Sequence, residues 1–320
     1  MTIVAKHKSQ IVHVKSELKK HFKLRDLGPT SFLLGVLIER DRSKKQLTLS
    51  QHHFITDILD TYGSPDMKGC DTPLDPGQKL SADMCPKSQE DMDKMQDKPY
   101  AQLVGTLMYL AIATRPDIAK AVGVLSRFTA KPGIAHWKAA QHLLRYLKNT
   151  MHYKLTYAPD PSQSELFTSY CDADHAGNPD NGKSTSGMVI KMGTGAVSWA
   201  SRLQTIVTLS TTEAENVSAV SAGQEIIWLR NLFTELGCTL EGPSTLYIDN
   251  QSALQVAKNP EHHGRMKHLD LRFYWLRDMV DAGLIRVDYI ATEAMPADGL
   301  TKLLGKLKVA EMAGRLGLRK

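Results

Sequence analysis

Cysteine is scarce and scattered in this sequence. Its 320 residues include four cysteines and no Cys-x-x-Cys pair, so we expect neither a disulfide framework nor a cysteine-based zinc module. Long apolar runs are also missing, which argues against a membrane-spanning segment. The first residues, MTIVAKHKSQ, lack the apolar stretch of a signal peptide. These absences predict an intracellular protein that is not secreted and has no membrane partner.

The overall composition is typical of a soluble globular protein. Hydrophobic residues make up 42% of the chain and charged residues 23%, both close to the globular average. The length is sufficient for one large or two modest domains. The net charge of +6 favours a polyanionic partner, although charge alone defines neither fold nor ligand.

The first half of the chain is predicted to be mainly helical, with a small β-hairpin. Residues 65–98 lack periodicity and are rich in Pro, Gly, Asp, Lys and Ser, which is typical of a loop or linker. The other predicted elements are a helix over 11–24, strands over 31–40 and 46–50, a helix with Ser50 as its N-cap and Gly63 as its stop, and helices over 100–114, 116–128 and 135–149.

The pattern changes at about residue 164, from helices to strands. Three strand candidates come first, and strands and helices then alternate, which predicts a mixed sheet with helices packed on it. The predicted elements are strands over 164–174, 186–193 and 195–202, a helix over 211–236, a strand over 244–250, helices over 252–258 and 266–282, a strand over 284–291, and a last helix from 296.

Residues 177–184, GNPDNGKS, match the G-x-x-x-x-G-K-[ST] pattern of a phosphate-binding P-loop. A P-loop requires a helix directly after it, because the helix N-terminus supplies the amides and the dipole that hold phosphate. The residues after Ser184, TSGMVIKMG, have the β-branched composition of a strand. We therefore interpret these residues as a hairpin connection and expect no nucleotide cofactor.

Acidic residues at predicted strand ends indicate a different chemistry. Asp172 lies near the end of the first strand of the sheet, and Asp249 lies at the end of the fourth. Glu215, near the start of the long helix, and Asp298, at the start of the last one, could join them. Four converging carboxylates require bound cations, and Mg²⁺ suits oxygen ligands best. Each acid alone also has a structural interpretation, since Asp249 and Asp298 could cap helices.

Glu213 and Glu215 cannot both face such a site, because residues two apart lie about 200° apart around a helix. Ser210-x-x-Glu213 matches a capping box, in which Glu213 folds back to a backbone amide. This gives Glu213 a structural role and leaves Glu215 as the site residue.

Several sequence motifs, taken together, resemble those of a known family. YCDADHAG, KSTSGMVIKMGTGAVSWASRLQ, LSTTEAENVSAV, LYIDNQSAL, HHGRMKHLDLRFYWLRD and PADGLTK are similar, in order and spacing, to the ribonuclease H domain of copia-type LTR retrotransposon Pol polyproteins. FKLRDLGPTSFLLGVLIER, LSQHHFITDILDTYG and the helices that follow resemble the end of the reverse transcriptase palm, the thumb and the connection of such elements.

The resemblance implies an α/β fold, with a ribonuclease H-like mixed five-stranded sheet and flanking helices after a mainly helical region with a small β-hairpin. The implied domains are a palm remnant over 1–64, the linker over 65–98, the helical thumb/connection over 99–160 and the ribonuclease H-like domain over 164–320. The family's polymerase motif, Tyr-x-Asp-Asp, does not occur in the sequence, so we expect no polymerase activity from this chain alone.

The resemblance also implies the reaction, which is hydrolysis of the RNA strand of an RNA–DNA hybrid by two Mg²⁺ ions, for which Mn²⁺ can substitute. The implied catalytic and metal-binding residues are Asp172, Glu215, Asp249 and Asp298. The implied nucleic-acid contacts are His263, Arg265, Lys267, His268, Asn250 and Gln251. The implied partners are the hybrid duplex and the rest of the reverse transcriptase, in the cytoplasm, a virus-like particle or the nucleus. The alternative is a catalytically silent fragment that binds nucleic acid.

Overall fold

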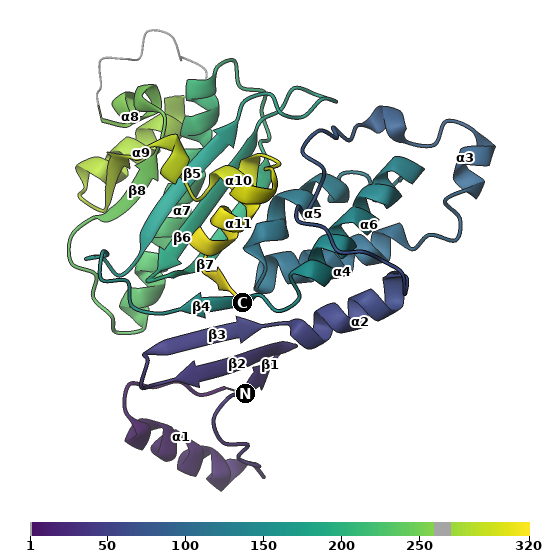
Figure 1. Cartoon of the computed structure of the whole chain (residues 1–320). Coiled ribbons are helices and arrows are strands. Elements are labelled where there is room, and N and C mark those ends of the chain that lie inside the picture. The colour runs from purple at the N-terminus through teal and green to yellow at the C-terminus, as the bar shows by residue number, and fades with distance from the viewer. Residues whose placement is uncertain (1, 259–269) are drawn as a thin grey trace.

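The computed structural model describes residues 2–258 and 270–320, and in this part of the chain the strands form two five-stranded sheets (Figure 1). The strands are β1 (Phe32–Leu33), β2 (Val36–Asp41), β3 (Gln46–Ser50), β4 (Lys154–Tyr157), β5 (Thr168–Asp174), β6 (Thr185–Met192), β7 (Gly195–Leu203), β8 (Ser244–Ile248), β9 (Ile285–Tyr289) and β10 (Leu318–Arg319). The helices are α1 (Lys8–His21), α2 (His52–Tyr62), α3 (Gln89–Asp93), α4 (Tyr100–Ala113), α5 (Ala119–Ser126), α6 (Ile134–Asn149), α7 (Thr211–Glu235), α8 (Gln251–Lys258), α9 (Asp270–Asp281), α10 (Asp298–Thr301) and α11 (Lys306–Arg315). Short 3-10 helices cover Ala82–Met84, Pro116–Ile118 and Thr292–Ala294. None of the described helices is long and apolar enough to cross a membrane.

The strand predicted over 31–40 is in fact a small hairpin of its own. Leu34 and Gly35 both have positive φ angles, 49° and 74°, and they connect Leu33 directly to its partner Val36. A two-residue loop with both residues left-handed is the turn that matches the twist of antiparallel strands. The prediction of one continuous strand was therefore wrong, because Leu34 adopts a conformation that its side chain disfavours.

Two predicted helix starts are shifted by a few residues. α1 begins at Lys8 and ends at His21, earlier than the predicted range of 11–24. α2 has Gln51, not Ser50, as its N-cap residue, because Ser50 is the last residue of β3. The Ser50 hydroxyl still accepts a hydrogen bond from the His52 amide at 3.2 Å.

The helical region has its own core, formed by α2, α4, α5 and α6. Residues 65–98, expected to be a loop or linker, contribute to that core through the buried side chains of Leu74, Leu80 and Met95. Inside it, Arg115 and Asp117 form an ion pair of 2.7 Å whose side chains are almost fully buried. The Tyr146 hydroxyl donates to the same Asp117 carboxylate at 2.8 Å.

The second sheet has the strand order β7-β6-β5-β8-β9. β5, β6 and β7 are antiparallel neighbours, whereas β8 is parallel to β5 and β9 is parallel to β8. α7, α8 and α9 cover one face, and α10 and α11 cover part of the other (Figure 1). This confirms the predicted α/β fold, a mixed five-stranded sheet with flanking helices.

The last part of the chain differs from its prediction. The single helix expected from residue 296 is two helices, because the backbone of Lys302 is extended and ends α10. Leu303 and Leu304 pack against the helical core, and Val309 of α11 is buried within it. β10 then pairs with β4 in the first sheet, so the end of the chain joins the two halves (Figure 1).

Candidate active site

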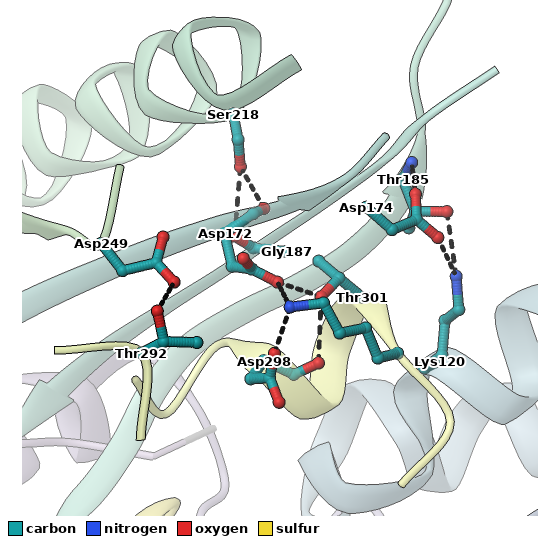
Figure 2. A network of polar contacts seen from close by, with 11 residues as sticks. Lys120, Asp172, Asp174, Thr185, Gly187, Ser218, Asp249, Thr292, Asp298 and Thr301 are labelled. Carbon is teal, nitrogen blue, oxygen red and sulfur yellow. Dashed lines mark hydrogen bonds and ion pairs between the residues drawn. The ribbon is translucent and has the colours of Figure 1, made fainter. Parts of the chain in front are cut away.

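The sheet places two acids side by side. β5 and β8 are parallel neighbours, so their carboxyl ends lie at the same edge of the sheet. Asp172 belongs to β5, and Asp249 directly follows β8. The Thr292 hydroxyl donates a hydrogen bond to Asp249 Oδ2 at 2.9 Å (Figure 2).

The start of α7 brings a third acid to this edge. Ser210 is the N-cap, and its hydroxyl accepts from the Glu213 amide at 3.2 Å. The Glu213 carboxylate folds back and accepts from the Leu209 amide, one residue before the amide that a capping box predicts. Glu213 is thereby occupied at the helix end, and Glu215 lies with the acids of the sheet, as the helical geometry requires.

Asp172, Glu215 and Asp249 form one compact cluster. Each offers a carboxylate oxygen, and these three oxygens lie within 4.8 Å of one another. Asp172 is 1% exposed and Glu215 is 6% exposed. Glu215 Oε2 is buried and has no hydrogen-bond partner among the described residues. A buried carboxylate oxygen without a partner is costly unless a ligand completes it.

The fourth predicted acid lies beside this cluster rather than within it. Asp298 is the first residue of α10, and Thr301 of the same turn donates a hydrogen bond to Asp172 Oδ2 (Figure 2). Lys302 pairs with Asp298 Oδ1, and its ammonium also lies 3.6 Å from Asp172 Oδ2. Asp298 thus faces Asp172 across the Lys302 ammonium.

A glycine allows α10 to approach the sheet this closely. Gly187 of β6 pairs directly with Asp172. A Cβ atom at this position would lie 2.7 Å from Thr301 Cγ2 and 3.0 Å from the carbonyl oxygen of Ala297. Any larger residue would therefore displace the turn that carries Asp298 and Thr301.

The cluster strongly perturbs the ionisation of its members. Burial, followed by the charges of Asp172 and Asp249, raises the pKa of Glu215 to about 9. Burial also raises the pKa of Asp172, although Lys302 and the Thr301 hydroxyl oppose the shift. Burial disfavours the charge of Lys302, but Asp172 and Asp298 outweigh it and raise the pKa of this ammonium. In the absence of a cation, Glu215 therefore holds a proton at neutral pH.

These residues fit a hard divalent cation. Three converging carboxylates, one with a buried oxygen that lacks a partner, supply the oxygen ligands that Mg²⁺ and Mn²⁺ prefer. Asp172, Glu215 and Asp249 would hold such an ion, and Asp298 is the nearby acid available to a second.

The predicted nucleic-acid contacts are only partly visible. His263, Arg265, Lys267 and His268 lie outside the described residues. The Asn250 side chain accepts from the Ala253 amide at 3.0 Å and so caps α8. Gln251 is the first residue of α8 and is exposed.

Sequence reasoning missed the residues that surround the acids. Thr292, Thr301 and Lys302 were not singled out, although the four-residue spacing of Asp298 and Lys302 is that of a helical ion pair. Lys120 of α5 was also missed. Its ammonium donates to Thr185 Oγ1 at 2.9 Å and lies 3.3 Å from Asp174 Oδ2 (Figure 2).

The loop over 177–184 is followed by a strand, as predicted. β6 begins at Thr185, immediately after the Lys-Ser pair. The Lys183 ammonium donates to the Thr205 carbonyl at 2.8 Å, and the Asn178 amide donates to the Lys183 carbonyl at 3.1 Å. Residues 177–184, which match the P-loop pattern, are thus a hairpin connection between the antiparallel strands β5 and β6.

Comparison with known proteins identifies the relatives of this chain. Residues 1–76 match the family model described as reverse transcriptase (RNA-dependent DNA polymerase). The chain is 43% identical to the retrovirus-related Pol polyprotein from transposon TNT 1-94 of Nicotiana tabacum, over 96% of this chain and 23% of the relative. It is 35% identical to the retrovirus-related Pol polyprotein from transposon RE1 of Arabidopsis thaliana, over 94% of this chain and 20% of the relative.

The chain therefore spans between 20% and 23% of the length of these curated relatives. Among solved structures, a ribonuclease H1 isolated from compost by a metagenomic approach aligns with a TM-score of 0.33 at 17% identity, over 43% of this chain and 93% of that one. That likeness is too low to carry a functional argument. The sequence relatives, which match 94% to 96% of the chain, show that it belongs to the family of retrovirus-related Pol polyproteins from transposons.

Proposed function

We propose that this chain is a ribonuclease H that hydrolyses the RNA strand of an RNA–DNA hybrid with the help of two Mg²⁺ ions. The observation that carries the proposal is the cluster of Asp172, Glu215 and Asp249, whose oxygens lie within 4.8 Å of one another at the edge of the sheet. Asp172, Glu215 and Asp249 would hold divalent ions, which would supply activation of a water molecule and stabilisation of the leaving oxygen of a phosphodiester.

The protein's own residues orient this machinery. Asp172 would hold the ions together with Glu215 and Asp249 on one side and with Asp298 on the other, because it lies near all three acids. Thr292 fixes the carboxylate of Asp249 by a hydrogen bond of 2.9 Å. The Ser218 hydroxyl of α7 donates to the Asp172 carbonyl at 2.8 Å, which fixes the backbone of β5 against the helix that carries Glu215 (Figure 2).

The choice of substrate rests on family membership. The RNA strand of a hybrid differs from DNA in its 2′-hydroxyl groups, which a protein can contact along the minor groove. Cleavage of the bond between a ribose 3′ oxygen and phosphorus would leave 3′-hydroxyl and 5′-phosphate ends. We expect Mn²⁺ to support the reaction as well, because carboxylate sites accept both ions.

Cleavage of an end-labelled RNA–DNA hybrid by the purified full chain tests the proposal. With Mg²⁺ we expect hybrid cleavage and no cleavage of duplex DNA of the same sequence. Asp249→Asn is expected to lower the cleavage rate by about 100-fold or more, because a metal ligand contributes several kcal/mol to the transition state. Asp57→Asn, on an exposed position of α2 in the other half of the chain, is the matched control and should cleave like the wild type.

The second candidate is a catalytically silent protein that binds nucleic acid. The net charge of +6 favours binding without requiring catalysis. This candidate predicts that the wild type binds the hybrid but leaves it intact with Mg²⁺ and with Mn²⁺. That result would overturn the ribonuclease proposal.

A further inference from the structure

Lys302 lies between two of the four acids. Its ammonium contacts Asp298 Oδ1 and is 3.6 Å from Asp172 Oδ2. Asp172 thereby lies between two different environments. On one side it faces Glu215 and Asp249, with which no described residue forms an ion pair. On the other side it faces Asp298, where Lys302 supplies a cation.

The position of Lys302 follows from the construction of α10. The helix is a single turn from Asp298 to Thr301, so Lys302 lies four residues after Asp298 and on the same side. The Thr301 hydroxyl donates to Asp172 and also lies 2.9 Å from the Asp298 carbonyl oxygen. These contacts fix the turn against β5. Because Lys302 directly follows this turn, its side chain lies close to Asp172 and Asp298.

The ammonium can leave this position without unfolding the turn. The Lys302 side chain is 44% exposed, whereas that of Asp172 is 2% exposed. A lysine has a long flexible stem and binds as a mobile point charge. The acids therefore stay in place if the ammonium moves to solvent. An exposed helical pair would contribute little by itself, but this lysine also reaches the buried carboxylate of another element.

We propose that Lys302 is an internal cation that occupies the second ion site, between Asp172 and Asp298, until a divalent ion displaces it. The inference rests on the proposed metal dependence of the site. The cluster of Asp172, Glu215 and Asp249 takes the first ion, because its oxygens converge and no described residue forms an ion pair with Glu215 or Asp249. The second ion must displace the Lys302 ammonium, so the two ions bind in sequence and the second binds more weakly.

Mn²⁺ binding to the metal-free full chain, without nucleic acid, tests this inference. Free Mn²⁺ is followed by electron paramagnetic resonance during titration, and the stoichiometry is checked by calorimetry. The variant is Lys302→Met, which keeps the apolar stem and removes the charge. The matched control is Lys306→Met, four residues further on, where the lysine pairs with Asp71 of the helical region at 2.9 Å. Both variants change the net charge equally.

We expect Lys302→Met to bind the second Mn²⁺ about tenfold more tightly than the wild type, which corresponds to about 1.4 kcal/mol. The affinity for the first ion should change by less than about threefold. Lys306→Met should bind both ions like the wild type, apart from the small effect of a distant charge. Lys302→Arg should keep the second site weak, because it keeps the positive charge.

Three results would overturn the inference. An unchanged or weaker second site in Lys302→Met would show that the lysine does not compete with the ion. An equal gain in affinity for the second ion in Lys306→Met would show that the effect comes from net charge alone. If neither the wild type nor any variant binds Mn²⁺, the proposed metal-dependent function fails together with the inference. If two ions bind and Lys302→Met has no effect, only the inference is refuted. Should Lys302→Met not fold, judged by circular dichroism, Lys302→Gln takes its place in the same titration.

Discussion

Replacing Glu215 by glutamine is expected to stabilise the metal-free protein at neutral pH. In the native state the pKa of Glu215 is raised to about 9 by burial and by Asp172 and Asp249, from an ordinary value of 4.5. Between these two values the unfolded chain has released a proton that the native chain retains, so stability falls as the pH rises. The free energy of unfolding falls by about 1.4 kcal/mol per pH unit, which amounts to about 3 kcal/mol at pH 7. Below pH 4.5 the carboxyl group is protonated in both states and the penalty vanishes.

Urea denaturation in the presence of a chelator, at pH 5.5, 7 and 8.5, measures this effect. The wild type should become less stable across the series relative to Glu215→Gln, and the variant should be more stable by about 3 kcal/mol at pH 7. Glu213→Gln is the control, because Glu213 lies two residues away and its carboxylate accepts from the Leu209 amide. It should gain no stability. An identical pH slope in the wild type and Glu215→Gln would refute the reasoning.

Two further predictions concern the stability of the fold, one through packing and one through a buried ion pair. Gly187→Ala places a Cβ 2.7 Å from Thr301 Cγ2 and 3.0 Å from the Ala297 carbonyl, so we expect a loss of about 1 to 3 kcal/mol in thermal or urea unfolding and slower hybrid cleavage. Wild-type cleavage by this variant would show that the position of α10 does not matter. Arg115→Ala leaves the Asp117 carboxylate buried without its cationic partner and should cost about 3 to 5 kcal/mol in the same unfolding experiment. Arg115→Ala combined with Asp117→Ala should be destabilised by less than the sum of the two single variants, and strict additivity would contradict an ion pair.

The sequence was sufficient to predict the second sheet and the acids at its edge. Each strand from β5 to β9 has a local pattern of apolar and β-branched residues bounded by turn residues, and such patterns do not depend on the rest of the fold. The distinction between Glu213 and Glu215 also follows from local geometry, since Ser210 defines where α7 begins. The structure accordingly brings Asp172, Glu215 and Asp249 together.

Other features depend on contacts between distant segments and have no local pattern. β10 is two residues long and exists only because it pairs with β4. The hairpin turn at Leu34 uses a residue that disfavours positive φ. The Lys302 ammonium reaches Asp172 because Gly187 admits α10 to the surface of the sheet, and that approach follows from packing rather than from spacing along the chain.

The two elements that carry Asp172 and Asp298, β5 and α10, are also attached to the helical half of the chain. Asp174 lies two residues beyond Asp172, on the same side of β5, and it pairs with the buried Lys120 of α5. On the other side, α10 leads into α11, whose Val309 is buried in the helical core. The separation of Asp172 from Asp298 is therefore determined by two attachments to the helical region as well as by the sheet. Because a site for two ions depends on that separation, the helical half acts as a structural part of the candidate active site.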